Sequence, residues 1–308
     1  MRKPRALASG DRLAVVAPAS PLSRGEFDQG IDEIRRLGFE PVYDESVFAR
    51  AAPGYVAGSP EIRATAIRAA LTDPSIRGII GVRGGYGSAQ VLPLLDASEF
   101  RDAGKPFIGY SDLTALLTVV TLQAGLTAFH GPTIDRLGHH EAGYDRTSFL
   151  AALCNRQPLG ELAPAGVEVI RSGEARGMLL GGTVTQLLAM LGTPYAFDPP
   201  QGYVLIFEEV GERPYRLDRM VTQLRQTGLL ARAAAVVIGD LPGCDEPSGA
   251  PTARSVMQHV FADFPGPVVF GFPIGHTKAP ALTLPVGVQC RVIAGATPRL
   301  VIEEAAVE

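Results

Sequence analysis

Short apolar runs alternate with segments of helical periodicity through the first half of the chain. The runs are typical of buried strands and lie at Leu13–Ala17, Gly78–Val82, the residues after Pro106, and Leu126–Phe129. Helices are expected between them at Glu26–Leu37, from the Ser59-Pro60 start signal to Asp73, and from Ser88 to about Leu95. Such alternation favours a doubly wound α/β domain with a parallel sheet, whose ligands bind at the carboxyl ends of the strands.

The pattern weakens between His130 and about Gly177, where glycine, proline and charged residues interrupt it. We interpret this stretch as a domain crossing. Beyond it, strands such as Val204–Phe207 and Ala235–Gly239 alternate less regularly with helices, which favours an α+β domain of swivelling or barrel-like type. The predicted organisation is an N-terminal α/β domain over residues 1–155, a linker over 156–176, and a C-terminal α+β domain over 177–308.

Composition narrows the class of protein. With 308 residues, 46% of them hydrophobic and 19% charged, the chain can fill the cores of two domains. A net charge of -4 gives no reason to expect nucleic acid or a membrane surface as a partner. The basic start of the chain meets Asp11 and Arg12 too early for a signal peptide, so a cytoplasmic protein is predicted.

The residue types that commonly bind metals are not spaced as in a metal site. The three cysteines are scattered, and His139-His140-Glu141 lacks a second pair of ligands. We therefore expect no metal site, no disulfide framework and no cofactor.

Ser111 lies in Gly109-Tyr110-Ser111-Asp112, where a strand is predicted to turn sharply into a helix. Such an elbow exposes a hydroxyl beside the free N–H groups of the helix start, which suit an oxyanion. The alternative is that Ser111 or Asp112 simply caps the helix, and this stretch taken alone favours the cap.

Three further candidates follow predicted strands. Glu208 comes directly after Val204–Phe207, where a carboxylate can face a site or mark the surface end of a strand. His276 lies in a turn-rich segment after a strand, and His130 lies at the end of another. Spacing alone does not choose between the two histidines as a base.

The loop Arg83-Gly84-Gly85-Tyr86-Gly87 follows a predicted strand but matches neither of the glycine-rich nucleotide-binding patterns. Its glycines instead suit a backbone N–H held close to a reacting carbonyl, which is the second donor that an oxyanion hole needs.

Taken together, these segments resemble the LD-carboxypeptidase family, serine peptidases that act on muropeptides. The segments that carry the resemblance are Gly10-Asp11, Ala17-Pro18, Asp73-Pro74, Arg83–Gly87, Gly109–Thr114, Gly181-Gly182, Phe207–Glu212, Pro214–Arg219 and Gly275-His276. They span nearly the whole chain in the family's order.

The resemblance implies a catalytic triad in which Ser111 attacks the carbonyl, His276 takes its proton and Glu208 orients the imidazole. It implies an oxyanion hole formed by the backbone N–H groups of Gly85 and Asp112. Arg83 and Tyr86 are expected to contact the substrate, with Arg83 recognising a carboxylate.

The reaction implied by the resemblance is hydrolysis of the bond between the L-centre of a diamino acid and the terminal D-alanine of a murein tetrapeptide. This is a cytoplasmic recycling step, and the family implies a homodimer.

Two alternatives stay open. Microcin C immunity peptidases share the triad but stack a tryptophan on adenine, whereas this chain contains no Trp. The other is a non-catalytic muropeptide-binding protein, which would follow if the three side chains lay too far apart.

The chain departs from the family pattern at Thr183, where members commonly carry Asn after the Gly-Gly pair.

Overall fold

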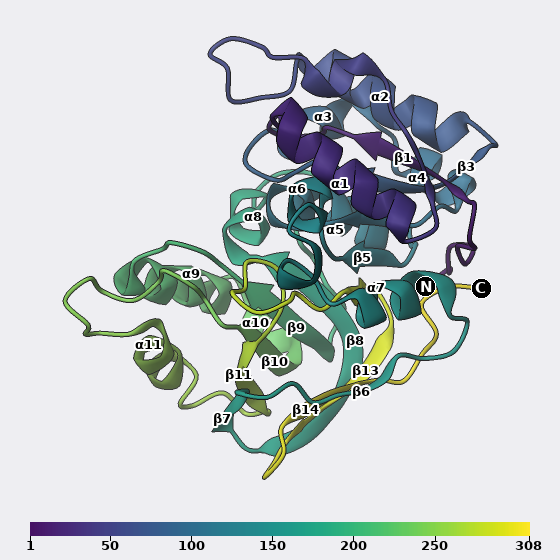
Figure 1. Ribbon diagram of the computed structural model, residues 1–308. Coiled ribbons are helices and arrows are strands. Elements are labelled where there is room, and N and C mark those ends of the chain that lie inside the picture. Colours follow the sequence, from purple (N-terminus) through teal and green to yellow (C-terminus); the bar gives the residue numbers. More distant parts are fainter.

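Two sheets carry the fold of the computed structural model, which describes residues 1–308 (Figure 1). The strands of the smaller sheet are β1 (Arg12–Val16), β2 (Glu40–Val42), β3 (Ile76–Gly81), β4 (Phe107–Gly109), β5 (Ala128–His130) and β12 (Leu284–Val286). They lie in the order β12-β5-β4-β3-β1-β2, and all neighbours except β12 and β5 are parallel.

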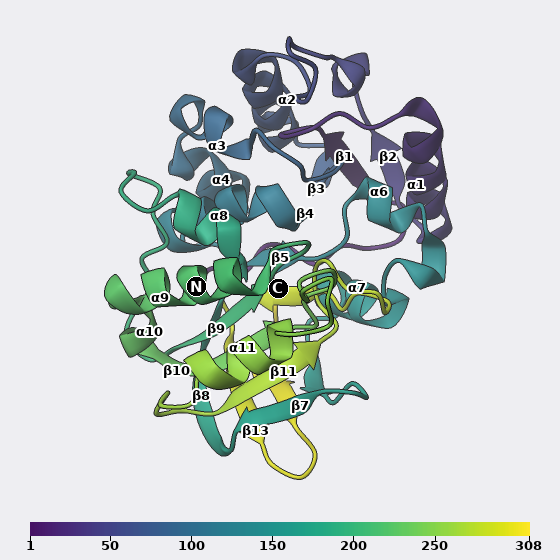
Figure 2. The ribbon, with the colours of Figure 1, turned by 90° about the vertical axis from the view of Figure 1, so that its left-hand side faces the viewer.

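Helices cover both faces of the smaller sheet (Figure 2). They are α1 (Arg24–Arg36), α2 (Pro60–Thr72), α3 (Ser88–Val91), α4 (Ala97–Ala103), α5 (Thr114–Thr118), α6 (Ile134–Leu137) and α7 (Arg146–Cys154). Helix α1 packs with α6 on one face, whereas α2 packs with α3 and α4 on the other. The predicted doubly wound α/β class is confirmed.

Local signals explain where the first helices begin. The Ser23 side chain accepts a hydrogen bond from Glu26 N–H, and the Glu26 side chain accepts one from Ser23 N–H, which completes a capping box for α1. Ser59 caps α2, and Pro60 occupies its first turn, as the sequence predicts. Short helical turns also occur at Glu45–Phe48, Leu92–Leu94, Ser111–Leu113, Val119–Gln123 and His140–Ala142.

The larger sheet has a parallel centre with antiparallel flanks. Its strands are β6 (Gly160–Leu162), β7 (Glu168–Arg171), β8 (Gly173–Thr183), β9 (Tyr203–Glu208), β10 (Ala233–Gly239), β11 (Val268–Phe272), β13 (Gln289–Ala294) and β14 (Arg299–Ile302). They lie in the order β6-β14-β13-β8-β9-β10-β11-β7, with β8 to β11 parallel. The long strand β8 joins the antiparallel and the parallel part of this sheet, because its first residues pair with β13 and its last with β9.

The helices of this half are α8 (Val184–Ala189), α9 (Pro214–Gln226), α10 (Leu229–Arg232) and α11 (Ala253–Val260). Helix α9 packs against α8, α10 and α11. The mixture of parallel and antiparallel strands with segregated helices agrees with the predicted α+β class.

The chain crosses between the two halves more than once. Residues 156–176, expected as a linker, contain β6 and β7, which form the two edges of the larger sheet. Strand β12 leaves the C-terminal half and pairs with β5, so that Leu284 lies opposite His130. Glu308 N–H donates to the Pro4 carbonyl at 3.0 Å, which brings the two ends of the chain together.

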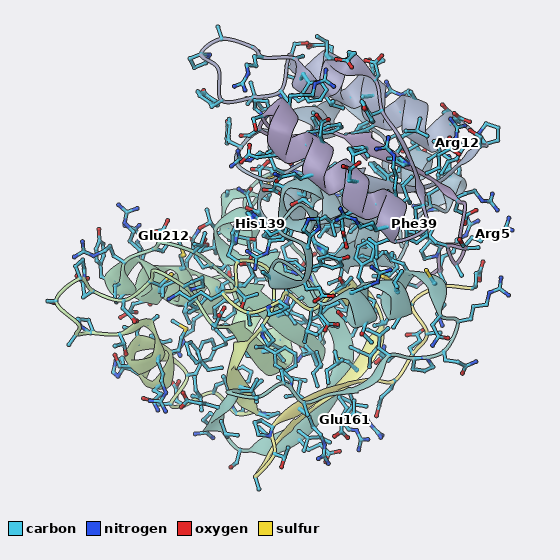
Figure 3. The ribbon with its side chains drawn as sticks, viewed as in Figure 1. Arg5, Arg12, Phe39, His139, Glu161 and Glu212 are labelled. Carbon is cyan, nitrogen blue, oxygen red and sulfur yellow. The ribbon has the colours of Figure 1, made fainter.

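Charged side chains such as Arg5 and Glu161 lie on the periphery, whereas Phe39 is buried beneath α1 (Figure 3). None of the helices combines the length and the apolar character needed to cross a bilayer.

The contact between α1 and α6 depends on the absence of a side chain at Gly30. A methyl group there would collide with the Ile134 carbonyl oxygen, which belongs to the backbone of α6. We expect Gly30→Ala to lower the free energy of unfolding by about 1–3 kcal/mol, measured by urea denaturation.

Gly25→Ala is the matched control, since Gly25 lies in the same helix with no atom within 4 Å of the added methyl group. We expect this variant to be up to about 1 kcal/mol more stable than the wild type. Equal effects of the two substitutions would contradict the packing argument.

Candidate active site

Ser111 stands at a strained turn between β4 and α5. Its φ of 60° lies in the left-handed region, which costs a non-glycine residue about 1–3 kcal/mol, and such strained residues cluster at active sites. The short helix that starts at Ser111 has Tyr110 as its N-cap residue and no side-chain cap bond. The Ser111 side chain is half-buried. The interpretation of Ser111 as a helix cap is therefore wrong.

The loop after β3 packs directly on this elbow. A side chain at Gly84 would place its Cβ 2.5 Å from Ser111 Cβ and 3.3 Å from the Asp112 nitrogen. Gly85 adopts a φ of 96°, and its N–H makes no backbone hydrogen bond. Gly84 thus lies against Ser111 and the Asp112 nitrogen, while the oxyanion hole formed by the Gly85 and Asp112 amides stays a prediction.

The Asp112 side chain ties this loop and the second half of the chain to the elbow. Its Oδ2 accepts a hydrogen bond from Ser88 N–H at 2.7 Å, and its Oδ1 accepts one from Gln186 Nε2 at 3.0 Å. The buried Arg63 donates to the Gly87 carbonyl at 2.7 Å and fixes the same loop from its other side.

Glu208 and His276 form a close pair at the carboxyl end of β9. Glu208 Oε2 accepts hydrogen bonds from His276 Nδ1 at 2.7 Å and from His276 N–H at 2.9 Å. Glu208 Oε1 accepts one from the Thr183 hydroxyl. The carboxylate is 1% exposed and the imidazole 21% exposed, so His276 presents one side to solvent.

The pKa values of this pair are shifted in opposite directions. Burial raises the pKa of Glu208, but the hydrogen bonds from His276 and Thr183 and the fields of the His276 and His130 rings together outweigh burial, so the net shift is downward. Burial lowers the pKa of His276, but the hydrogen bond and charge of Glu208 outweigh it and raise the pKa above its ordinary value. The pair therefore favours a carboxylate next to an imidazole of increased basicity.

The elbow and the pair come from different halves of the chain and meet at their junction. The Tyr110 ring contacts the His276 ring, with 4.9 Å between centroids. Thr183 N–H donates to Thr114 Oγ1 at 3.1 Å, and Arg136 donates to the Thr277 carbonyl. Tyr110, the chain neighbour of Ser111, thus lies beside the pair, and no hydrogen bond joins the Ser111 hydroxyl to His276.

The second candidate histidine lies on the other side of the carboxylate. His130 is fully buried, so it cannot touch a substrate, yet its Nε2 is 3.9 Å from Glu208 Oε1. Spacing leaves His130 and His276 as rivals for the base, whereas the structure places both around the same carboxylate.

The expected substrate contacts lie on the loop after β3. Arg83 is partly buried and forms no ion pair, and Tyr86 is 48% exposed. The Tyr86 ring packs edge-on against Tyr55, with 5.7 Å between centroids. Sequence reasoning missed Tyr55 and Gln186, since no pattern links those distant segments to the elbow.

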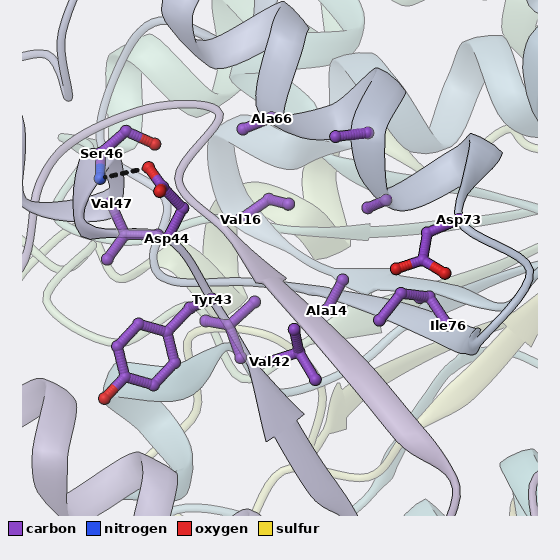
Figure 4. Close-up of a pocket in the computed structure, with 13 residues that line it drawn as sticks. Ala14, Val16, Val42, Tyr43, Asp44, Ser46, Val47, Ala66, Asp73 and Ile76 are labelled. Atoms are coloured by element: carbon purple, nitrogen blue, oxygen red, sulfur yellow. Dashed lines mark hydrogen bonds between the residues drawn. The ribbon is translucent and has the colours of Figure 1, made fainter.

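An apolar cavity of about 210 Å³ lies elsewhere, between α2 and the β1–β2 edge of the smaller sheet (Figure 4). Its two carboxylates are Asp44 and Asp73, and Asp44 accepts a hydrogen bond from Ser46 N–H. Ser111, Glu208 and His276 do not line it. No three His, Cys, Asp or Glu side chains cluster closely enough to hold a metal ion.

Comparison with known proteins defines the class. Residues 13–131 match the LD-carboxypeptidase N-terminal domain, and residues 176–292 match the LD-carboxypeptidase C-terminal domain. The chain belongs to the LD-carboxypeptidase family and is a serine-type carboxypeptidase.

Particular relatives are known by sequence and by structure. The chain is similar to the murein tetrapeptide carboxypeptidase of Pseudomonas aeruginosa, with 30% identity over 86% of this chain and 88% of the relative. The muramoyltetrapeptide carboxypeptidase from Oxalobacter formigenes superposes with a TM-score of 0.83, 26% identity and coverage of 96% and 100% of the two chains. MccF in complex with glutamyl sulfamoyl guanosine shares the fold, with a TM-score of 0.88, 22% identity and full coverage of both chains.

The Glu208–His276 geometry predicts a base whose pKa is raised more by Glu208 than by any other carboxylate. Glu208→Gln removes the charge and leaves the burial, so we expect the His276 pKa to fall below its ordinary value. The measurement is a pH titration of the histidine ring signals by NMR.

Glu209→Gln is the matched control. Glu209 is also buried, but its oxygens accept hydrogen bonds from Thr185 and Val210, and only its charge reaches His276. We expect Glu209→Gln to lower the pKa of His276 less than Glu208→Gln does. An equal or larger shift would contradict the assignment of Glu208 as the partner of His276.

Proposed function

We propose that this chain hydrolyses the bond between the L-centre of a diamino acid and the terminal D-alanine of a murein tetrapeptide, using Ser111, His276 and Glu208. The single observation that carries the proposal is the buried Glu208 carboxylate paired with His276 beside the strained elbow of Ser111. Family membership and the names of the Pseudomonas and Oxalobacter relatives support the murein substrate.

In the first half of the reaction, Ser111 Oγ attacks the carbonyl carbon while its proton moves to His276 Nε2. Glu208 holds the Nδ1–H of His276, which fixes the tautomer and stabilises the imidazolium that forms. The amides of Gly85 and Asp112 donate to the oxyanion of the tetrahedral intermediate.

In the second half, the imidazolium gives its proton to the leaving amine, and D-alanine departs. Water then attacks the acyl-enzyme with His276 as base, which restores Ser111. Nucleophile–base hydrogen bonds are often long in free enzymes and tighten when substrate binds, which accounts for the unformed Ser111–His276 bond here.

A substrate carboxylate fits the loop after β3. The Arg83 guanidinium is free of ion pairs and matches a carboxylate through two parallel hydrogen bonds. The aminoacyl-nucleotide reaction of MccF-like peptidases is the competing proposal, and the absence of Trp from the chain disfavours it. The dimer and the cytoplasmic location remain predictions.

Removal of the nucleophile should abolish the reaction. We expect Ser111→Ala to lower kcat for D-alanine release from muramoyl tetrapeptide by about 10⁴-fold or more. Ser248→Ala, in an exposed loop, is the control and should match the wild type. Unchanged release by Ser111→Ala would remove the mechanism, and cleavage of aminoacyl sulfamoyl nucleotides in preference to tetrapeptide would favour the competing proposal.

Loss of the free guanidinium should weaken substrate binding more than chemistry. We expect Arg83→Gln to raise KM for the tetrapeptide about 10-fold or more, because a charged hydrogen bond is lost, with a smaller change in kcat. Arg77→Gln, near the opposite end of β3, is the matched control. An unchanged KM would show that Arg83 does not bind the substrate.

A further inference from the structure

His130 is the most anomalous polar residue in the structure. Its side chain is 0% exposed, and both of its ring nitrogens lack a hydrogen-bond partner. A buried polar group without a partner destabilises the fold, since it loses its bonds to water and gains none in return. An apolar side chain would avoid this loss, so a role in the site would account for the presence of a histidine.

The surroundings of His130 point to Glu208. Its Nε2 lies 3.9 Å from Glu208 Oε1, the oxygen that does not contact His276. The Tyr110 ring packs edge-on against both imidazoles, with centroids 6.2 Å from His130 and 4.9 Å from His276. The backbone of His130 is fixed on both sides, because β5 pairs with β4 and β12.

We propose that His130 is a positioning residue that directs its Nε2–H dipole at Glu208 Oε1 and so holds the carboxylate ionised, with Oε2 aimed at His276. The inference rests on the hydrolytic function proposed above. Burial lowers the pKa of His130, which keeps the ring neutral. A neutral donor stabilises the Glu208 carboxylate, whereas a cation at the same place would compete with His276 for its charge.

The length of the contact matters for this role. At 3.9 Å, Nε2 acts on the carboxylate as a dipole on a charge and forms no fixed hydrogen bond. The Nε2–H dipole therefore adds its field at Oε1 without displacing the Thr183 hydroxyl, which stays bound to that oxygen.

The test compares His130→Leu with His130→Gln, whose amide nitrogen can occupy the place of Nε2. For D-alanine release from muramoyl tetrapeptide, we expect His130→Leu to lower kcat about 10- to 100-fold with KM within about twofold of the wild type. We expect His130→Gln to recover most of that loss. His259→Gln, on the exposed side of α11, is the control for loss of an imidazole.

Thermal unfolding of the same variants separates positioning from packing. Positioning predicts that His130→Leu unfolds at or above the wild-type temperature despite its lower kcat, because two unpartnered nitrogens are gone. If His130 is purely structural, His130→Leu unfolds at a lower temperature than the wild type, and kcat is unchanged in the fraction that remains folded. If His130→Leu does not fold, His130→Met takes its place against His130→Gln.

The outcomes are distinct. A wild-type chain that releases no D-alanine overturns the proposed function and this inference with it. An active wild type with an equally active His130→Leu overturns the inference alone, as does a folded His130→Gln that remains as slow as His130→Leu.

Discussion

The buried carboxylate of Glu208 is the constraint on which the site depends. A charge removed from water is tolerated only where hydrogen bonds and an opposite charge replace the lost solvation. Here Oε2 receives two hydrogen bonds from His276, and Oε1 receives one from Thr183. Each donor is at the end of a strand or in the loop after one, so the compensation exists only when the larger sheet is formed.

Two sheets are needed because each supplies half of the chemistry at the carboxyl ends of its parallel strands. The smaller sheet delivers the elbow after β4 and the glycine loop after β3, while the larger one delivers Glu208 from β9 and His276 after β11. The register between them is set by polar bonds across the junction, such as Gln186 to Asp112, and by β12, which adds a C-terminal segment to the N-terminal sheet. The site is thus fixed by contacts far apart in sequence.

That dependence explains which features the sequence could predict. Caps, glycine stops and apolar runs are local, and they located α1, α2, β1 and β9 to within a few residues. The strands β6, β7 and β12 have only three or four residues and gain their stability from distant partners, so no local pattern reveals them. For the same reason spacing could not choose between His130 and His276: their difference is burial on opposite sides of Glu208.

The pH range in which His276 can act as a base differs from the range in which the charges of Glu208 and His276 stabilise the fold. The pKa of Glu208 is lowered in the fold, so its contribution to stability is present above its unfolded value and is lost as pH falls through the folded value. The pKa of His276 is raised, so its contribution is complete below the unfolded value and is lost as pH rises through the folded value. A base must be neutral to accept a proton, which requires a pH above the raised pKa of His276. The pH range in which His276 can act as a base is therefore the range in which the imidazolium charge no longer stabilises the fold. The hydrogen bonds to Glu208 and the packing of two large apolar cores hold the site together there.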